Sequence, residues 1–187
     1  MKRTVLFGAI LAAFAPGVVL ADMNYTNLEI NYLDLDVGEG VSVNGDGFEI
    51  GGSWELNDQF HLFGSWQDQS LDFGIDGRTL ELGAGWSHGF SDKLDFVGTL
   101  SMVDAELEAG GVTASDDAIA LGGGIRSRLG DSFELEAGLK YVDFDSGSDT
   151  GISVGGRYYF NDSMALGVSL DSNDNADTLR LGFRWEF

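Results

Sequence analysis

The last nine residues place the strongest constraint on the fold, because their side chains alternate strictly between apolar residues and charged residues or glycine. The apolar positions are Leu179, Leu181, Phe183, Trp185 and Phe187. Since successive side chains of a β-strand point to opposite faces, this pattern predicts a strand with one fully apolar face. A soluble edge strand shows the same alternation, so the rest of the chain must decide what that face contacts.

The start of the chain is typical of a secretory signal peptide. Lys2 and Arg3 precede an apolar run at residues 5–15 and a small-residue cleavage site. The apolar run is too short for a membrane anchor, which needs about 20 residues. We therefore expect a signal peptide over residues 1–21 and a single mature domain over residues 22–187.

Composition excludes several classes of protein. The chain has no cysteine, so neither disulfides nor thiolate metal sites are available. The mature part keeps eight of the ten basic residues and all 31 acids, a net charge of −23. Nucleic acid is excluded as a partner, because its recognition needs a basic surface. A hydrophobic content of 43% argues against a disordered acidic chain.

Alternating segments separated by turn residues predict ten strands in the mature chain. The expected strands are 25–34, 47–56, 60–68, 79–90, 94–105, 118–129, 133–144, 151–160, 164–171 and 178–187. Every second connection is tight, and we expect the others to be longer loops. That asymmetry is typical of a transmembrane barrel with short periplasmic turns and longer external loops. We predict an all-β, antiparallel up-and-down transmembrane β-barrel, with eight strands as the alternative if two segments form hairpins within loops.

The apolar faces of several predicted strands end at an aspartate on the side of the longer loops. One column runs from Phe133 to Tyr141 and is followed by Asp143, and another runs from Leu94 to Met102 and is followed by Asp104. A charge on a lipid-facing surface is costly, so each aspartate marks the edge of the hydrocarbon. A soluble sandwich or lipocalin would instead point these columns inward, and it would leave the glycine-rich, basic opposite face unexplained.

The predicted inward face carries most of the basic residues of the mature chain, together with acids. We expect a lumen charge network of Glu49, Glu55, Glu81, Arg126, Arg128, Lys140, Arg157, Arg180 and Arg184. Further inward acids are Glu29, Asp95, Glu134, Glu136 and Glu186. The basic residues are expected to form one wall that faces acids on the other, because buried charges require partners. The network is either a structural salt-bridge plug or the lining of a narrow, polarised pore with water beside the inward glycines.

The predicted external loops and strand tips are acidic and hold 18 of the 31 acids. Oxygen ligands at this density suit Ca²⁺ or Mg²⁺. Weak candidate metal ligands are Asp143, Asp145, Asp149, Asp171 and Asp174. Neither stretch has the later glutamate of a calcium loop, so a solvated acidic rim is the competing interpretation. No other cofactor is expected.

Signals of an enzyme are poor. The only histidines, His61 and His88, lie close to tight turns and therefore on the periplasmic side. Outer-membrane hydrolases that pair a histidine with serine or aspartate need it at the outer rim. We therefore expect no catalytic residues.

The whole mature chain resembles the small Gram-negative outer-membrane barrels of the OmpX, OmpA-domain and OmpW kind. The features that carry this resemblance are residues 179–187, the tight turns and the outward columns. The stretch 58–64 also resembles short Gly- and Asp-rich barrels sometimes labelled activators of plant immunity. The resemblance implies export to the outer membrane, contact with lipid and lipopolysaccharide, and no cofactor. It also implies that the barrel-assembly machinery reads residues 179–187 as an assembly signal.

Fold does not fix the task of such a barrel. A structural or cell-surface interaction role is the leading expectation, with an external partner that the sequence leaves unspecified. A narrow porin-like channel for small solutes or ions is the alternative, and an outer-membrane enzyme is a distant third.

Overall fold

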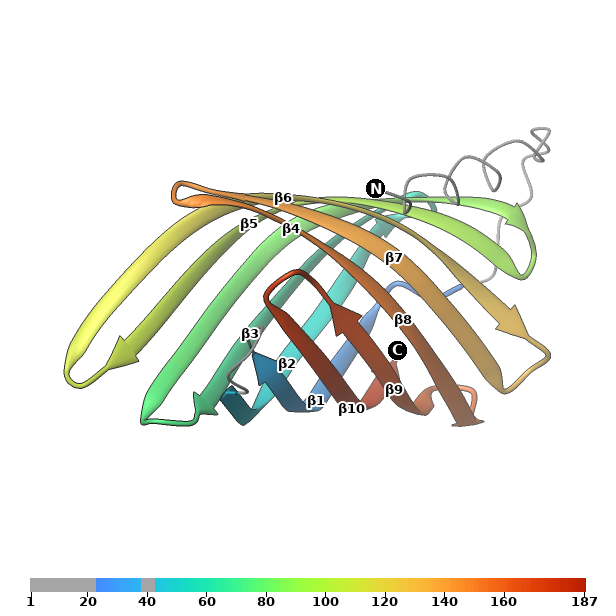
Figure 1. Cartoon of the computed structure of the whole chain (residues 1–187). Helices are drawn as coiled ribbons and strands as arrows, with labels where there is room; N and C mark the ends of the chain where they lie inside the picture. Colours follow the sequence, from blue (N-terminus) through green and yellow to red (C-terminus); the bar gives the residue numbers. More distant parts are fainter. Residues whose placement is uncertain (1–22, 38–42) are drawn as a thin grey trace, which may run out of the picture.

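The computed structural model describes residues 23–37 and 43–187, which form a closed β-barrel of ten strands (Figure 1). The predicted signal peptide lies outside the described residues. The strands are β1 (Asn27–Val37), β2 (Val43–Asn57), β3 (Phe60–Leu71), β4 (Ile75–Ser91), β5 (Leu94–Ala109), β6 (Val112–Leu129), β7 (Phe133–Phe144), β8 (Gly147–Asn161), β9 (Met164–Ser172) and β10 (Ala176–Glu186). The described part of the chain contains no helix long and apolar enough to cross a membrane.

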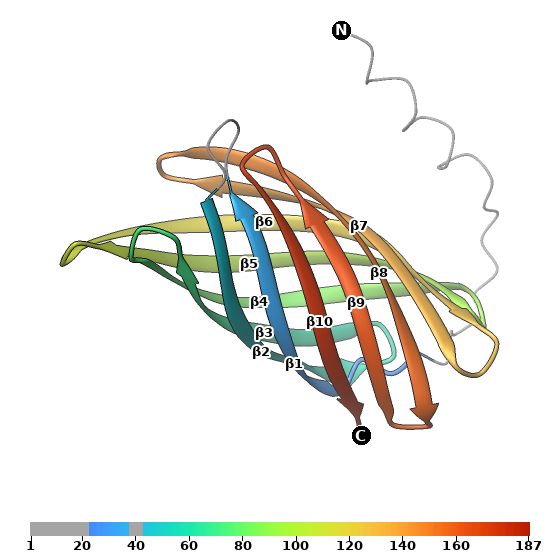
Figure 2. The ribbon, with the colours of Figure 1, turned by 60° about the horizontal axis from the view of Figure 1, so that its bottom comes forward.

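Each strand pairs antiparallel with its neighbours in sequence, and β10 pairs with β1 to close the barrel. The closing ladder runs without a register shift from Asn27↔Glu186 to Val37↔Ala176. Figure 2 shows β10 lying between β1 and β9. The prediction of an up-and-down barrel is confirmed, with ten strands rather than eight.

The predicted faces of the strands are also correct. Large apolar side chains remain exposed on the outer surface along every strand, which is the arrangement of a barrel that faces lipid. On β4, β5 and β6 they include Leu80, Leu82, Trp86, Leu100, Met102, Ile119, Leu121 and Ile125. On these three strands the apolar band ends at Asp104, at the end of the barrel away from the C-terminus. Asp104 pairs with Leu80 on β4 and with Asp117 on β6.

The predicted difference in loop length is wrong. The described connections are short at both ends of the barrel, with residues 110–111 between β5 and β6 and residues 145–146 between β7 and β8. Gly110 and Gly111 have φ of 58° and 80°, so two residues suffice to reverse the chain there. The segments that we expected to be loops continue the ladders instead, and β4, β5 and β6 reach 17, 16 and 18 residues.

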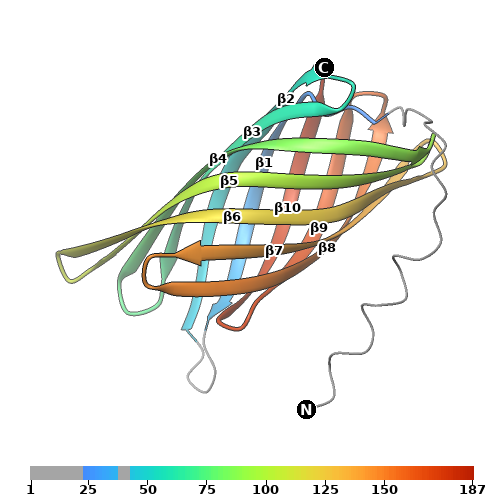
Figure 3. The same cartoon turned by 90° about the horizontal axis from the view of Figure 1, so that it is seen from above.

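The longest hairpin, residues 104–117 of β5 and β6, is here named the β5–β6 extension. It projects farther than the neighbouring hairpins (Figure 3). In the extension the two faces exchange character, because Glu106 and Glu108 continue the outer face, whereas Leu107 and Ala114 continue the inner one. The sequence pattern predicted a loop for this segment. Its outer face is acidic and lacks the apolar alternation of a membrane strand.

Glycines on the inner wall make room for side chains of neighbouring strands. A Cβ atom at Gly85 would meet the imidazole of His61 at 2.1 Å, and one at Gly122 would meet the hydroxyl of Thr99 at 2.3 Å. A Cβ at Gly83 would meet the carbonyl oxygen of Leu100 at 2.7 Å. Glycines at these positions therefore make room in the narrow interior for His61 and Thr99 and for close approach of the backbone.

Two adjacent glycines of β6 test this account. An added Cβ at Gly124 on the inner wall would lie 2.7 Å from the carbonyl oxygen of Ala137, whereas at Gly123 on the outer wall the nearest atom is 3.8 Å away. We expect Gly124→Ala to lower the stability by about 1–3 kcal/mol and Gly123→Ala to have little effect. Thermal unfolding in detergent, followed by circular dichroism, measures both. Equal midpoints for the two variants would contradict a tightly packed inner wall.

Candidate functional site

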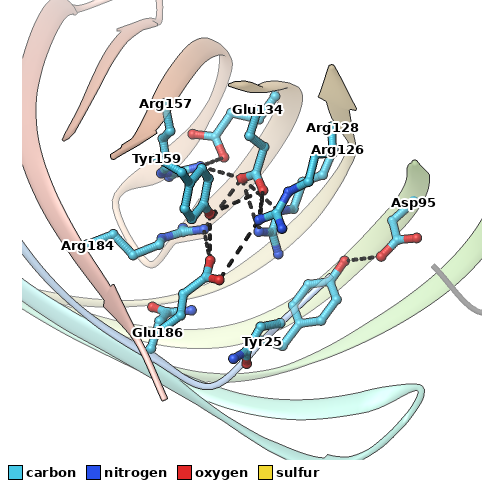
Figure 4. A network of polar contacts seen from close by, with 12 residues as sticks. Tyr25, Asp95, Arg126, Arg128, Glu134, Arg157, Tyr159, Arg184 and Glu186 are labelled. Atoms are coloured by element: carbon cyan, nitrogen blue, oxygen red, sulfur yellow. Dashed lines mark hydrogen bonds and ion pairs between the residues drawn. The ribbon is translucent and has the colours of Figure 1, made fainter. Parts of the chain in front are cut away.

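A buried carboxylate organises the half of the lumen near the C-terminus and the start of β1. Glu134 on β7 has an exposed fraction of 0% and lies among four guanidinium groups. Both of its oxygens accept hydrogen bonds at 3.0 Å from Arg126, and one accepts a bond at 3.0 Å from Arg157. Arg184 approaches to 3.5 Å and Arg128 to 3.6 Å. Figure 4 shows this carboxylate at the centre of the cluster.

Further acids and a tyrosine balance the arginines. Glu186 on β10 accepts a 2.5 Å hydrogen bond from the hydroxyl of Tyr159 and lies 3.8 Å from Arg184. The guanidinium of Arg128 sits 4.4 Å from the centre of the Tyr159 ring. Glu29 on β1 is ion-paired to Arg184. The cluster thus joins β1, β6, β7, β8 and β10 across the interior.

The segment before β1 completes the closure of this end. The hydroxyl of Tyr25 donates a 2.8 Å hydrogen bond to the buried Asp95, and its ring stacks on His61 at 4.6 Å. Arg126 lies 4.7 Å from the centre of the same ring. Thr26 holds the segment in place, because its hydroxyl accepts a bond from the backbone of Glu55. Together the Glu134 cluster and Tyr25 form what we name the plug.

The other half of the lumen is a chamber of about 700 Å³, whose lining extends as far as Phe144, Asp149 and Asn173. Tyr25, His61 and Arg126 line its bottom, whereas Glu134 and Glu186 do not reach it. The two alternatives of the sequence analysis therefore occur together. Paired charges fill one half of the lumen, and the other half contains space large enough for water.

Ion pairs also cross the chamber, with weaker burial. Lys140 on β7 reaches Glu81 on β4 at 2.6 Å, and the lysine side chain is 43% exposed. Ser101 donates a second bond of 2.6 Å to the same carboxylate. On the other side Glu49 accepts bonds from Asn31 at 2.7 Å and Gln67 at 2.5 Å.

The partners of the predicted network differ from those expected. Eight of the nine residues form ion pairs, and Glu55 forms none among the described residues. Arg126 and Arg157 bind Glu134 on the neighbouring strand rather than the acids of the opposite wall. The register explains this correction, because Glu134 stands directly between Arg128 on β6 and Arg157 on β8. Of the predicted acids, Glu49 and Glu81 do have basic partners, Arg180 and Lys140.

The plug contains residues that the sequence analysis did not assign to the site. Tyr25 was expected to begin the first strand, but that strand begins at Asn27. Tyr159 falls on the predicted inward face of its strand, and this placement was the available signal for it. Nothing in the local pattern around Tyr25 indicates that its side chain enters the lumen and lines the chamber.

The five weak candidates for a metal site do not converge. Asp171 is ion-paired to Arg180, Asp149 accepts a 3.2 Å bond from Asn175, and Asp143 lies 3.3 Å from the hydroxyl of Tyr141. The remaining two are Asp145 and Asp174, which lie in turns. Within residues 23–37 and 43–187 no group of three or more acidic or histidine side chains is placed to hold an ion.

Neither histidine is arranged for acid–base chemistry. His61 is buried against Tyr25, and its Nδ1 has no hydrogen-bond partner in the described part of the chain. His88 lies on the outer surface, where its ring stacks on Trp86 at 5.7 Å.

No model of a protein family and no curated protein sequence matches the chain. Solved structures with a similar fold include a KdgM porin in complex with disordered oligogalacturonate, 13% identical, with a TM-score of 0.49, covering 85% of this chain and 99% of that one. A NanC porin is 12% identical, with a TM-score of 0.47 and coverage of 87% and 100%. Ail, the attachment invasion locus protein of Yersinia pestis, is 18% identical, with a TM-score of 0.46 and coverage of 88% and 100%. These likenesses concern the fold alone.

Two glutamates on the inner face of β7 test the plug. Glu134→Gln leaves four guanidinium groups around a neutral amide, and loss of a buried partner typically costs about 3–5 kcal/mol. Glu136→Gln is the matched control, because the Glu136 side chain is 28% exposed and, among the described residues, is ion-paired with Arg157 alone. We expect the control to cost about 1 kcal/mol or less. Urea unfolding in lipid vesicles measures both, and similar losses for the two variants would indicate that water reaches Glu134.

Proposed function

We propose that this chain is an outer-membrane β-barrel of a Gram-negative bacterium that presents a rigid sheet at the cell surface for interaction with other molecules. The observation that carries the proposal is the β5–β6 extension, which continues past the apolar band at Asp104. A transporter needs no such projection, whereas a surface interaction protein needs a rigid element beyond the lipid.

The position of the C-terminus sets the orientation of the barrel in the membrane. Phe187 lies at the plug end of the barrel, where its backbone N–H donates a hydrogen bond to the carbonyl oxygen of Thr26. In outer-membrane barrels both termini face the periplasm. In this proposal the extension therefore faces outward, lipid and lipopolysaccharide surround the barrel, and the assembly machinery acts on residues 179–187.

The alternative function, a narrow channel, is supported by the chamber and opposed by the plug. Glu134, with an exposed fraction of 0%, and Asp95, with 2%, leave no solvent beside them. We infer that the chamber is a closed-ended vestibule.

Single cysteines test the orientation, since the natural chain has none. Val112 at the tip of the extension is 72% exposed, and Asp58 lies in an exposed turn at the opposite end. We expect a membrane-impermeant maleimide to label Val112→Cys in intact cells and to label Asp58→Cys only after the outer membrane is broken. The reverse pattern would exclude a surface role for the extension.

Ion conductance tests the vestibule. In a planar bilayer the wild-type barrel should carry no steady current, because the plug blocks the lumen. Tyr25→Ala removes the ring that packs between Asp95, His61 and Arg126, and it should permit measurable current. Tyr32→Ala, on the lipid-facing side of β1, is the control and should remain closed. Steady conductance of the wild type would favour the channel.

A further inference from the structure

One edge of the β5–β6 extension is open. Residues 112–127 of β6 pair with β5, but pairing with β7 begins only at Ala118↔Phe144. Among the described residues, the stretch 112–117 therefore has a neighbouring strand on one side only (Figure 3). Such an edge is a template for a further strand.

The hydrogen-bonding groups at this edge can be identified. The carbonyl of Asp117 accepts a bond from the backbone N–H of Asp145, so Asp117 points its polar groups toward the side of β7. In an antiparallel ladder this direction alternates along the strand. Ser115 and Thr113 therefore present their N–H and C=O groups at the open edge, and both residues are exposed.

Among the described residues, the β7–β8 connection contacts only the root of this edge. There the backbone N–H of Asp145 donates a hydrogen bond to the carbonyl of Asp117, and the Ser146 hydroxyl donates one to the carboxylate of Asp116. Beyond it, residues 112–115 lack the usual protections. Lysine, proline, bulges or a covering segment normally prevent unwanted pairing. Residues 112–117 contain neither lysine nor proline, and the β5–β6 ladder has no register shift. The four residues 112–115 span about 13 Å, which is enough to pair with a short extended peptide.

The two faces beside the edge differ in chemistry. The outer face carries Asp104, Glu106 and Glu108 opposite residues 117, 115 and 113. On the inner face Leu107 pairs with Ala114 and Ala109 with Val112, and the leucine is 51% exposed. Asp116, on the same face, accepts a hydrogen bond from the Ser146 hydroxyl. A strand added here would have its alternate side chains next to an acidic face and an apolar face.

We propose that residues 112–115 bind an extended segment of another protein, which adds one strand to the edge and alternates basic with apolar residues. The proposal rests on the proposed surface function and specifies its partner. Backbone hydrogen bonds give affinity in this mode of recognition, and the alternating side chains give specificity. A second copy of this chain is disfavoured, because its own edge would bring a second set of acids to the same face.

The acids act at a distance. Strands of a sheet lie about 4.8 Å apart, so the carboxylates of β5 are roughly 10 Å from an added strand, near the Debye length at physiological salt. Salt should therefore weaken the attraction between these acids and the basic side chains of the added strand. Backbone hydrogen bonds set the register of that strand.

The test uses the barrel in nanodiscs of zwitterionic lipid and a fluorescent peptide of alternating lysine and valine. Fluorescence anisotropy should show saturable binding, at least tenfold tighter than for a peptide with the same residues in two blocks. Empty nanodiscs should bind neither peptide. Equal affinity for the two peptides would overturn the proposal, because it would indicate attraction without strand pairing.

Variants of one residue locate the binding at the edge. Ser115→Pro removes an edge N–H that has no partner within the described chain, and proline is tolerated at such positions. It should weaken binding about tenfold, whereas Ser115→Ala, which keeps the N–H, should change it less than twofold. Thermal unfolding confirms that both variants fold. Binding that survives Ser115→Pro would overturn the proposal.

Two further outcomes separate the alternatives. Glu108→Gln should weaken binding at low salt and leave it unchanged at high salt, and no effect at low salt would overturn the role of the acidic face. Concentration-dependent dimers that Ser115→Pro abolishes would overturn the choice of partner in favour of a second copy. Because nanodiscs expose both ends of the barrel, a failure here is distinct from a failure of cysteine labelling in cells.

Discussion

In a lipid environment a backbone N–H or C=O without a partner costs several kcal/mol, and this requirement governs the whole structure. The ten strands meet it only because β10 pairs with β1 over the full length of β1. Once the ladder is closed, the period of two sends apolar side chains to the lipid and polar ones to the interior. The remaining features follow from how that interior is filled.

The interior must hold charges within a narrow space, and it does so in two ways. Near the termini, Glu134 gathers arginines from β6, β8 and β10, so that charge compensation and packing coincide. Toward the other end, glycines replace side chains, and the ion pair between Lys140 and Glu81 is partly hydrated. The same barrel therefore holds densely paired, buried charges in one half and partly exposed charges beside an open chamber in the other.

Beyond the lipid band the constraint on the backbone relaxes, because water can satisfy an unpaired group. There the structure leaves an edge open at residues 112–117 of β6, and residues 147–151 of β8 likewise pair with β7 alone. The outer surface changes at the same level from apolar to acidic, at Asp104. The closed barrel and the open extension are thus two responses of the same ladder to two solvents.

The sequence by itself determined the side of the sheet on which each residue lies and the positions of the inward charges, because both depend on a local period of two. It favoured ten strands over eight, and the closed ladder decided between them. The pairing of charges required the tertiary structure, since register decides that Arg157 stands opposite Glu134 rather than Glu49. The placement of Tyr25 inside the lumen also required the tertiary structure, because Asp95 and Arg126, which it contacts, are distant in sequence. The extension escaped the sequence analysis because an acidic outer face lacks the apolar signal by which membrane strands are recognised. Local pattern fixes which way a side chain points, and only the closed ladder decides what it meets.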